Sequence, residues 1–156
     1  MCETISFADK VREELILFGV EGATMEEVLS NIATVLVEKG IAKESFPTAL
    51  LERERTYPTG LNLGELNLAI PHANPEHINE VTVTIAIPKQ PIIFKDMGDP
   101  DSDVLVSLVV CLTLQKADDN IKMLPALMSY FAQEKNLKAI LACTEPAQVM
   151  ALLPKE

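Results

Sequence analysis

The length, composition and charge of the chain exclude several classes of protein. Its 156 residues are 48% hydrophobic but only 4% aromatic, which predicts one domain over residues 1–156 with a mostly aliphatic core. The net charge of −10 argues against nucleic acid as the main partner, because phosphate contacts are made by Lys and Arg, and it favours a basic protein surface as the partner.

The sequence carries no signal for the membrane or for secretion. No apolar run approaches the roughly 18 residues needed to span a bilayer, and residues 1–10 contain acids without an apolar signal-peptide core. Cys2, Cys111 and Cys143 are odd in number and far apart, which is typical neither of a zinc site nor of a secreted disulfide framework. We therefore expect a cytoplasmic protein with no direct membrane insertion, in which Cys111 is an inert core thiol.

The first part of the chain predicts two helices. Residues 1–20 are ambiguous, because residues 15–18 could form a strand while residues 9–14 fit a helical turn equally well. Thr24 and Glu27 then form a capping-box pattern that begins a helix, and Lys39-Gly40 ends it. A second helix begins near Ser45. The alternating charges of residues 52–55 end this helix and are expected to form a solvated face.

A short strand leads to a histidine. Leu66, Leu68 and Ile70 alternate with smaller or polar residues, which predicts a strand with one buried face. Pro71 ends it, because proline has no backbone N–H to donate. His72 therefore lies just beyond a strand end, where loops on a rigid scaffold carry function. Its position alone leaves two alternatives open: a nucleophile that carries a phosphoryl group, or a surface histidine in a turn.

The remaining elements complete an α/β pattern. Strands are predicted over residues 81–87 and 92–94, and an almost unbroken apolar run predicts a strand covered on both faces over residues 104–114. A helical pattern follows over residues 121–131, in which Pro125 requires either a helix start near Lys122 or a kink, and a short helix is expected over residues 136–142. Thr144 is expected to cap a last helix with Pro146 in its first turn. The fold class predicted is a compact single-domain α/β sandwich, with a mixed β-sheet flanked by helices on both faces.

Few kinds of chemistry fit these residues. There is no glycine-rich nucleotide loop and no G-x-S-x-G turn for a serine nucleophile. His72 and His77 alone make a weak metal site, and Asp99, Asp101 and Asp103 lack the glycine and glutamate of a calcium loop. No metal or cofactor is therefore expected.

His72 remains as the candidate reactive group. A neutral imidazole nitrogen is a competent nucleophile at neutral pH. Attack on phosphorus needs one ring nitrogen exposed and unprotonated, while the other donates to a fixed acceptor. Phosphoryl oxygens need donors such as arginine and backbone N–H groups. Arg53, Thr59 and Gly60 precede the His72 strand and are candidates to fold over it.

The segments Arg53-Glu54, Thr59-Gly60-Leu61 and Ala69-Ile70-Pro71-His72-Ala73 together resemble a known family. It is the fructose–mannitol type of enzyme IIA in the bacterial phosphoenolpyruvate-dependent sugar phosphotransferase system. The Tyr-Pro-Thr-Gly form of the loop over residues 57–60 is most similar to the galactitol-specific A component. The resemblance covers about residues 24–153.

The resemblance implies a function and a set of site residues. His72 matches the phosphorylated histidine, Arg53 the arginine beside it, and Thr59 the loop threonine. Mannitol- and fructose-type members carry a second histidine at the start of a later helix; the matching position here is Asn120, and His77 is a candidate to substitute for the missing imidazole.

The resemblance also implies two partners. His72 would receive a phosphoryl group from the histidine-containing phosphocarrier protein and pass it to a cysteine of the sugar-specific B component, for uptake of galactitol or a related polyol. The alternative is a stand-alone regulatory module that binds targets according to its phosphorylation state.

Overall fold

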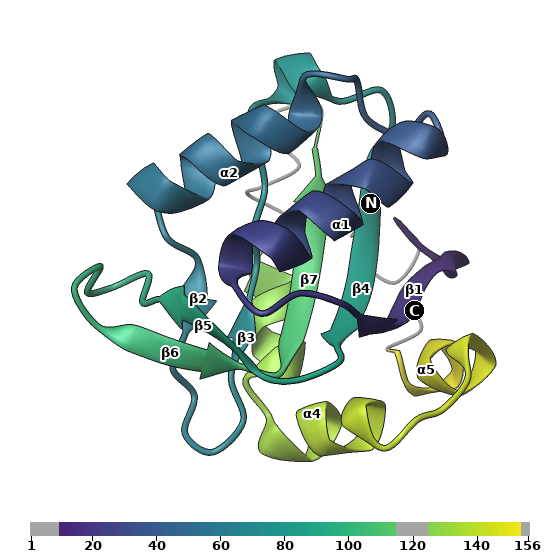
Figure 1. Cartoon of the computed structure of the whole chain (residues 1–156). Helices are drawn as coiled ribbons and strands as arrows, with labels where there is room; N and C mark the ends of the chain where they lie inside the picture. Colours follow the sequence, from purple (N-terminus) through teal and green to yellow (C-terminus); the bar gives the residue numbers. More distant parts are fainter. Residues whose placement is uncertain (1–9, 115–124, 154–156) are drawn as a thin grey trace, which may run out of the picture.

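A mixed β-sheet lies at the centre of the structure, a computed structural model that describes residues 10–114 and 125–153 (Figure 1). Among these residues the main sheet has five strands, in the order β1 (Val11–Val20), β4 (Thr82–Pro88), β7 (Leu108–Thr113), β3 (Leu68–Ala69) and β2 (Gly60–Leu61). The β1–β4 and β3–β7 pairs are parallel, whereas the β4–β7 and β2–β3 pairs are antiparallel. The predicted mixed sheet is confirmed.

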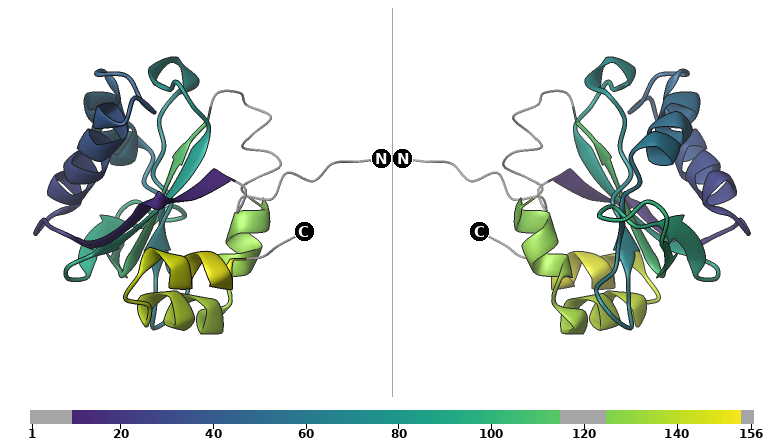
Figure 2. Two further views of the ribbon diagram at one scale, coloured as in Figure 1. Left: turned by 90° about the vertical axis from the view of Figure 1, so that its right-hand side faces the viewer. Right: turned by 90° about the vertical axis from the view of Figure 1, so that its left-hand side faces the viewer.

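Helices cover both faces of this sheet, as predicted. Helices α1 (Met25–Glu38) and α2 (Phe46–Thr56) lie on one face. Helical residues 125–131, α4 (Glu134–Leu141) and α5 (Pro146–Leu152) lie on the other (Figure 2). Within the described part of the chain, no helix has the length and apolar character needed to cross a membrane.

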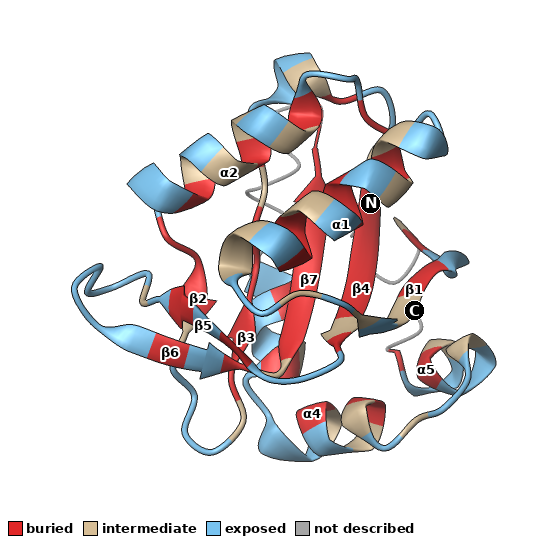
Figure 3. Cartoon of the chain, viewed as in Figure 1, coloured by how far each residue is buried: buried red, intermediate tan, exposed pale blue. Residues whose placement is uncertain are grey.

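Alternate residues of the central strands face two separate hydrophobic cores. Ala69 and Cys111 pack with α1 and α2, whereas Leu68, Ile70 and Leu112 pack with the C-terminal helices. The central strands are accordingly buried along their length (Figure 3). The prediction of one buried face for the strand before His72 is therefore wrong, because this strand lies inside a sheet that is covered on both sides.

The N-terminal elements follow their local signals. Residues 11–20, ambiguous in sequence, form the edge strand β1. Helix α1 begins after Thr24, whose hydroxyl oxygen accepts from the Glu27 N–H at 3.2 Å, while the Glu27 carboxylate accepts from the Ala23 N–H at 2.7 Å. Gly40, with a φ of 76°, follows the helix as predicted.

The predicted strand over residues 104–114 is in fact two strands. Asp103–Val106 forms β6, which pairs with β5 (Ile92–Lys95) in a separate two-stranded sheet, and β7 begins after Ser107. The Ser107 N–H donates to the carbonyl of Asn67 at 3.0 Å, which redirects the chain into the central sheet. This contact joins residues 40 positions apart, so the apolar pattern does not reveal it.

The C-terminal helices differ from the prediction only in detail. Helix α4 is confirmed, and α5 has Pro146 in its first turn. Its N-cap is Glu145 rather than Thr144, because Glu145 forms the capping box with Gln148, whose side-chain oxygen accepts from the Glu145 N–H at 3.1 Å. Pro125 is helical, but the predicted start of that helix and Asn120 lie outside the described residues.

Candidate functional site

His72 is held at the end of β3 by the neighbouring strand. After β3 the chain continues through Ile70 and Pro71, and the Pro71 carbonyl accepts from the Leu112 N–H at 3.0 Å. His72 and Leu112 then form a single parallel β-bridge. Although Pro71 has no N–H to donate, its carbonyl keeps the segment attached to β7. His72 is therefore fixed to β7, in which every residue is buried, while its own side chain stays half-buried.

The ring of His72 has a defined tautomer. Its Nδ1 atom lies 2.9 Å from the carbonyl oxygen of Ile70. A carbonyl oxygen can only accept, so Nδ1 carries the proton and Nε2 carries the lone pair in the neutral ring. This is the arrangement that nucleophilic attack by a histidine requires: one nitrogen donates to a fixed acceptor and the other is free to react.

The surroundings of His72 keep the ring neutral. Burial lowers the pKa of His72 below its usual 6.5, the hydrogen bond to the Ile70 carbonyl opposes this, and the positive charge of Arg53 lowers the pKa further. The net effect is a lowered pKa. At neutral pH the ring therefore keeps its lone pair.

The guanidinium of Arg53 has N–H groups available to bind a ligand. Its Nη1 atom donates to Oδ1 of Asn74 at 3.1 Å, and its guanidinium lies over the ring of Tyr57, 5.1 Å from the ring centre. Its Nε atom is buried and has no hydrogen-bond partner, and no carboxylate pairs with Arg53, among the residues that the structure describes. An arginine of this kind is suited to bind an anion.

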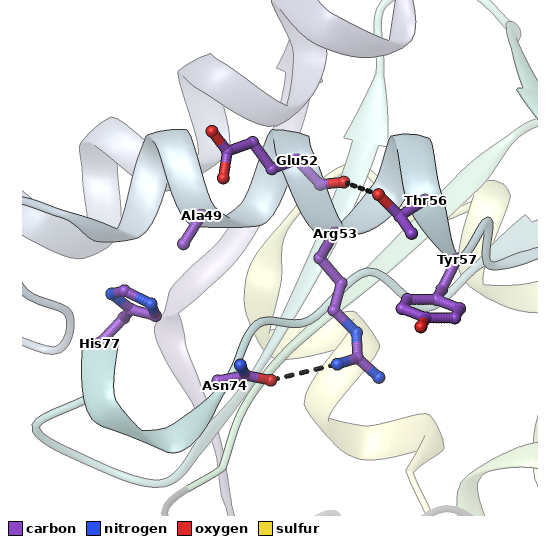
Figure 4. Close-up of a pocket in the computed structure, with 7 residues that line it drawn as sticks. All are labelled: Ala49, Glu52, Arg53, Thr56, Tyr57, Asn74 and His77. Atoms are coloured by element: carbon purple, nitrogen blue, oxygen red, sulfur yellow. Dashed lines mark hydrogen bonds between the residues drawn. The ribbon is translucent and has the colours of Figure 1, made fainter.

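A pocket of about 240 Å³ lies beside Arg53, between α2 and the short 3₁₀ helix η2 (Pro75–His77). Figure 4 shows Arg53, Asn74 and His77 around it, with the carboxylate of Glu52 directed away from the guanidinium. Its lining residues are Ala49, Glu52, Arg53, Thr56, Tyr57, Asn74 and His77. The predicted site residues Arg53 and His77 thus share one pocket.

His77 makes its own contacts away from His72. Its Nδ1 atom lies 2.8 Å from Oγ of Ser45, and its carbonyl accepts from the Lys43 N–H at 2.9 Å. None of its described contacts reaches His72. Asn120, the position that matches the second histidine of the mannitol type, lies outside the described residues.

Thr59 supports the site from within the core. It is 2% exposed, and its N–H and hydroxyl donate to the two carboxylate oxygens of Glu54, both at 2.8 Å. Its carbonyl accepts from the Ile70 N–H at 3.3 Å. The following residue, Gly60, pairs with Ala69. The loop before β2 is therefore joined to the strand that leads to His72.

Sequence reasoning missed Glu54. The prediction of a solvated charged face is wrong for this residue, which is 2% exposed. Burial raises the pKa of Glu54 to about 7, although the hydrogen bonds from Thr59 oppose the shift. The sequence did contain a signal for this burial. Glu54 follows Phe46 and Leu50 at intervals of four residues, and the three share the buried face of α2.

The structure also describes the aspartates and the buried cysteine that the sequence raised. Asp99 and Asp101 lie in an exposed turn, and no group of three or more potential metal ligands occurs among the described residues. Cys111 is fully buried, and burial raises the pKa of its thiol to about 12, so this thiol stays protonated and unreactive.

The sheet, the helix layers and the histidine at the strand end agree with one class of protein. Residues 10–156 match the family model described as "Phosphoenolpyruvate-dependent sugar phosphotransferase system, EIIA 2", and the chain belongs to this family. Enzyme IIA components are phosphotransferases that pass phosphoryl groups through a histidine. The resemblance noted in the sequence is confirmed.

Several characterised relatives share most of the chain. The galactitol-specific EIIA component of Escherichia coli strain K12 is 29% identical over 127 residues, which cover 81% of this chain and 84% of that protein. The mannitol-specific enzyme IIA component of Halalkalibacterium halodurans is 29% identical and covers 90% and 91% of the two chains. The transcriptional regulator ManR of Bacillus subtilis is 26% identical over 85% of this chain, but over only 19% of its own length.

Solved structures show the same fold. The mannitol-specific cryptic enzyme IIA of Escherichia coli has a TM-score of 0.74 at 20% identity, covering 94% of this chain and 96% of that one. The enzyme IIA chain in a complex of IIAMTL with phosphorylated IIBMTL, also from Escherichia coli, has a TM-score of 0.71 at 21% identity, covering 91% and 96% of the two chains.

Proposed function

We propose that Nε2 of His72 accepts a phosphoryl group from the histidine-containing phosphocarrier protein and passes it to a cysteine of a sugar-specific B component in the cytoplasm. The observation that carries this proposal is the hydrogen bond from Nδ1 of His72 to the Ile70 carbonyl at 2.9 Å. This bond leaves Nε2 as the nitrogen with the free lone pair.

The proposed transfer consists of two displacements at phosphorus. In the first, the Nε2 lone pair forms a bond to phosphorus while the bond from phosphorus to the donor's imidazole breaks, and that electron pair returns to the donor ring. In the second, a thiolate of the B component forms the new bond, and the phosphorus–Nε2 bond breaks with its electron pair returning to His72. Each step makes one bond and breaks one.

Arg53 is proposed to neutralise the phosphoryl oxygens. It lowers the pKa of His72 through its charge, and its buried Nε has no hydrogen-bond partner in the described structure. Thr59 is proposed to support the site through the backbone rather than as a direct donor, because its hydroxyl already donates to Glu54. His77 and Asn120 are further candidates for contact with the phosphoryl group, His77 because it shares a pocket with Arg53.

The substrate proposed for the complete transport system is galactitol or a related polyol. Support comes from the relatives with similar identity over most of this chain, which are galactitol- and mannitol-specific components. The B component of a galactitol system is therefore the first acceptor to test, with a mannitol-type B component beside it.

The second candidate function is regulation. The match to the transcriptional regulator ManR supports a module whose phosphorylation state controls binding to a target. A regulator of this kind would accept the phosphoryl group but would not pass it rapidly to a B component.

Phosphorylation in a reconstituted system tests the proposal. The chain is incubated with labelled phosphoenolpyruvate and the two general phosphotransferase proteins. We expect one label per chain, stable in base and lost in acid, that is absent from His72→Ala and retained in His77→Ala. A label that persists in His72→Ala would overturn the assignment. Adding B components then separates a carrier, which loses its label within seconds to minutes, from a regulator, which keeps it.

A further inference from the structure

A chain of hydrogen bonds connects the buried carboxylate of Glu54 to the ring of His72. The carboxylate accepts from the N–H and the hydroxyl of Thr59, both at 2.8 Å. The Thr59 carbonyl accepts from the Ile70 N–H at 3.3 Å, and the Ile70 carbonyl accepts from Nδ1 of His72 at 2.9 Å. The side chain on α2 thus reaches the imidazole through the backbone of two other segments.

Each link in this chain adds a contact that restrains the segment before His72, beside the attachment of Pro71 to β7. Thr59 lies in the loop between α2 and β2, and Glu54 binds both of its donors. The Thr59 carbonyl holds the N–H of Ile70, and Ile70 supplies the acceptor that gives His72 its tautomer. A shift of the loop that contains Thr59 would therefore change the position of the His72 ring.

No other polar contact of the Glu54 carboxylate occurs within the described ranges 10–114 and 125–153. No cation pairs with Glu54 among the described residues. Its charge contributes to the raised pKa of the Cys111 thiol on β7, which is inert. A carboxylate without a cation in an aliphatic core is costly, unless hydrogen bonds compensate for it. Among the residues that the structure describes, those bonds come from Thr59 alone.

We infer that Glu54 is a positioning residue for His72, because it fixes, through Thr59 and Ile70, the carbonyl that holds the ring with its proton on Nδ1. The inference deepens the proposed function, since it assumes that Nε2 is the reacting atom. Its structural part, the tautomer of His72, can be measured without any phosphoryl transfer.

Three substitutions at Glu54 separate its possible contributions. Glu54→Gln keeps an oxygen for the Thr59 N–H, and its amide can donate to the Thr59 hydroxyl, so the geometry survives without the charge. Glu54→Leu removes both acceptors. Glu54→Asp keeps the charge but places the carboxylate one methylene further from Thr59. This variant replaces Glu54→Leu in the test if the leucine variant does not fold.

The tautomer of His72 is read from the ¹⁵N shifts of its two ring nitrogens. We expect the protein and Glu54→Gln to show the Nδ1–H form, Glu54→Leu to show a mixture of both forms, and Glu54→Asp to show a smaller admixture. The phosphorylation rate should fall about tenfold in Glu54→Leu, because a small misplacement of a reacting group is costly, and stay within about twofold of the original in Glu54→Gln.

Asn67→Leu is the matched control. Asn67 is also buried, at 8% exposed, and its side chain binds the N–H groups of Leu63 and Gly64 and the carbonyl of Leu105. The variant should lose stability but keep the Nδ1–H form. An unchanged tautomer in both Glu54→Leu and Glu54→Asp, or an equal change in Asn67→Leu, would overturn the inference. Failure of His72 to become phosphorylated in the unaltered protein would overturn the proposed function instead.

Discussion

The protonation state of His72 depends on burial, the Ile70 carbonyl and Arg53, in that order. Burial and the guanidinium both disfavour the charged ring, while the carbonyl favours it. The sequence singled out both His72 and Arg53. It could not show that the carbonyl of Ile70, two residues before the histidine, would be the acceptor for Nδ1, because the residue types do not specify the side-chain rotamer on which this contact depends.

Removing the charge of Arg53 should raise the pKa of His72. We expect the ring of the unaltered protein to titrate below 6.5, and the ring of Arg53→Gln to titrate closer to 6.5, because one of the two effects that lower the pKa is lost. The titration is followed by NMR of the ring protons between pH 4 and 8.

Arg55→Gln is the control for this measurement. Arg55 lies on the same helix but pairs with Glu26 at 3.6 Å and is exposed, so its loss should leave the His72 midpoint unchanged. A midpoint in Arg53→Gln at or below that of the unaltered protein would contradict the prediction.

The burial of Glu54 could not be predicted from the sequence with the same certainty as the role of His72. Two successive residues of α2 point to opposite environments, Arg53 to a surface pocket and Glu54 to the core. Alternating charges are usually solvated, and the helical spacing that places Glu54 with Phe46 and Leu50 was the weaker of two competing signals. In the fold, Thr59 donates to both carboxylate oxygens of Glu54, which is what allows this one charged residue to be buried.

Between elements, close packing joins β2 to the β5–β6 hairpin. Gly60 forms a parallel bridge with Asp96, and its carbonyl accepts from the Met97 N–H at 2.8 Å. A Cβ atom at position 60 would lie 2.6 Å from the backbone oxygen of Lys95 and 3.2 Å from Cβ of Phe94. The backbone of the loop that carries Thr59 can approach the hairpin this closely only with glycine at position 60.

Gly60→Ala should therefore destabilise the fold. We expect a loss of about 1–3 kcal/mol in the free energy of unfolding, because the backbone of the hairpin has to move to admit the methyl group. Denaturant titration at one pH measures it.

Gly98→Ala provides the comparison in the same region. Its nearest neighbour would be the Asp96 carboxylate at 3.4 Å, an ordinary contact, and we expect a change within about 0.5 kcal/mol. Equal effects of the two substitutions would show that the Lys95 contact does not determine the cost.

Elements whose structural cause lies within their own segment were predictable, and those whose cause lies elsewhere in the chain were not. Helix α1 and strand β4 follow from residues within their own segments, the cap at Thr24 and the alternation through Thr82–Pro88. The break at Ser107 was not predictable, because its N–H binds the carbonyl of Asn67 in a distant loop. Sequence patterns report neighbours along the chain better than neighbours in space.

For the molecule as a whole, the layered architecture was predictable and the strand order was not. The almost unbroken apolar run over residues 104–114 indicates a strand covered on both faces, and helical patterns predominate at both ends of the chain, which sufficed to expect helices on both faces. Nothing in these patterns says that β7 lies between β4 and β3, an arrangement that places Leu112 beside Pro71 and so fixes the position of His72.

The stability of the whole fold should depend on pH through Glu54. Its pKa rises from 4.5 to about 7 on folding, so the folded state binds the proton more tightly. The resulting stabilisation is fully present below pH 4.5 and is lost as the pH rises through 7, by about 3 kcal/mol in total. In Glu54→Gln this loss should be absent.

The measurement compares the unfolding free energies of the unaltered protein and Glu54→Gln at pH 5 and pH 8. His72, whose pKa is lowered, contributes with the opposite sign, since its stabilisation is present above 6.5 and is lost as the pH falls. Because both proteins contain His72, its effect cancels in the difference. A difference that stays constant between the two pH values would contradict the prediction.

The hydrogen bond between Nδ1 of His72 and the Ile70 carbonyl has a consequence for the energetics of the proposed transfer. If Nε2 bonds to phosphorus while Nδ1 keeps its proton, the phosphorylated ring is an imidazolium cation. When a thiolate then takes the phosphoryl group, the leaving group is a neutral imidazole rather than an imidazolate anion. No proton has to move at the histidine in either direction, and only one of the two phosphohistidine regioisomers can form.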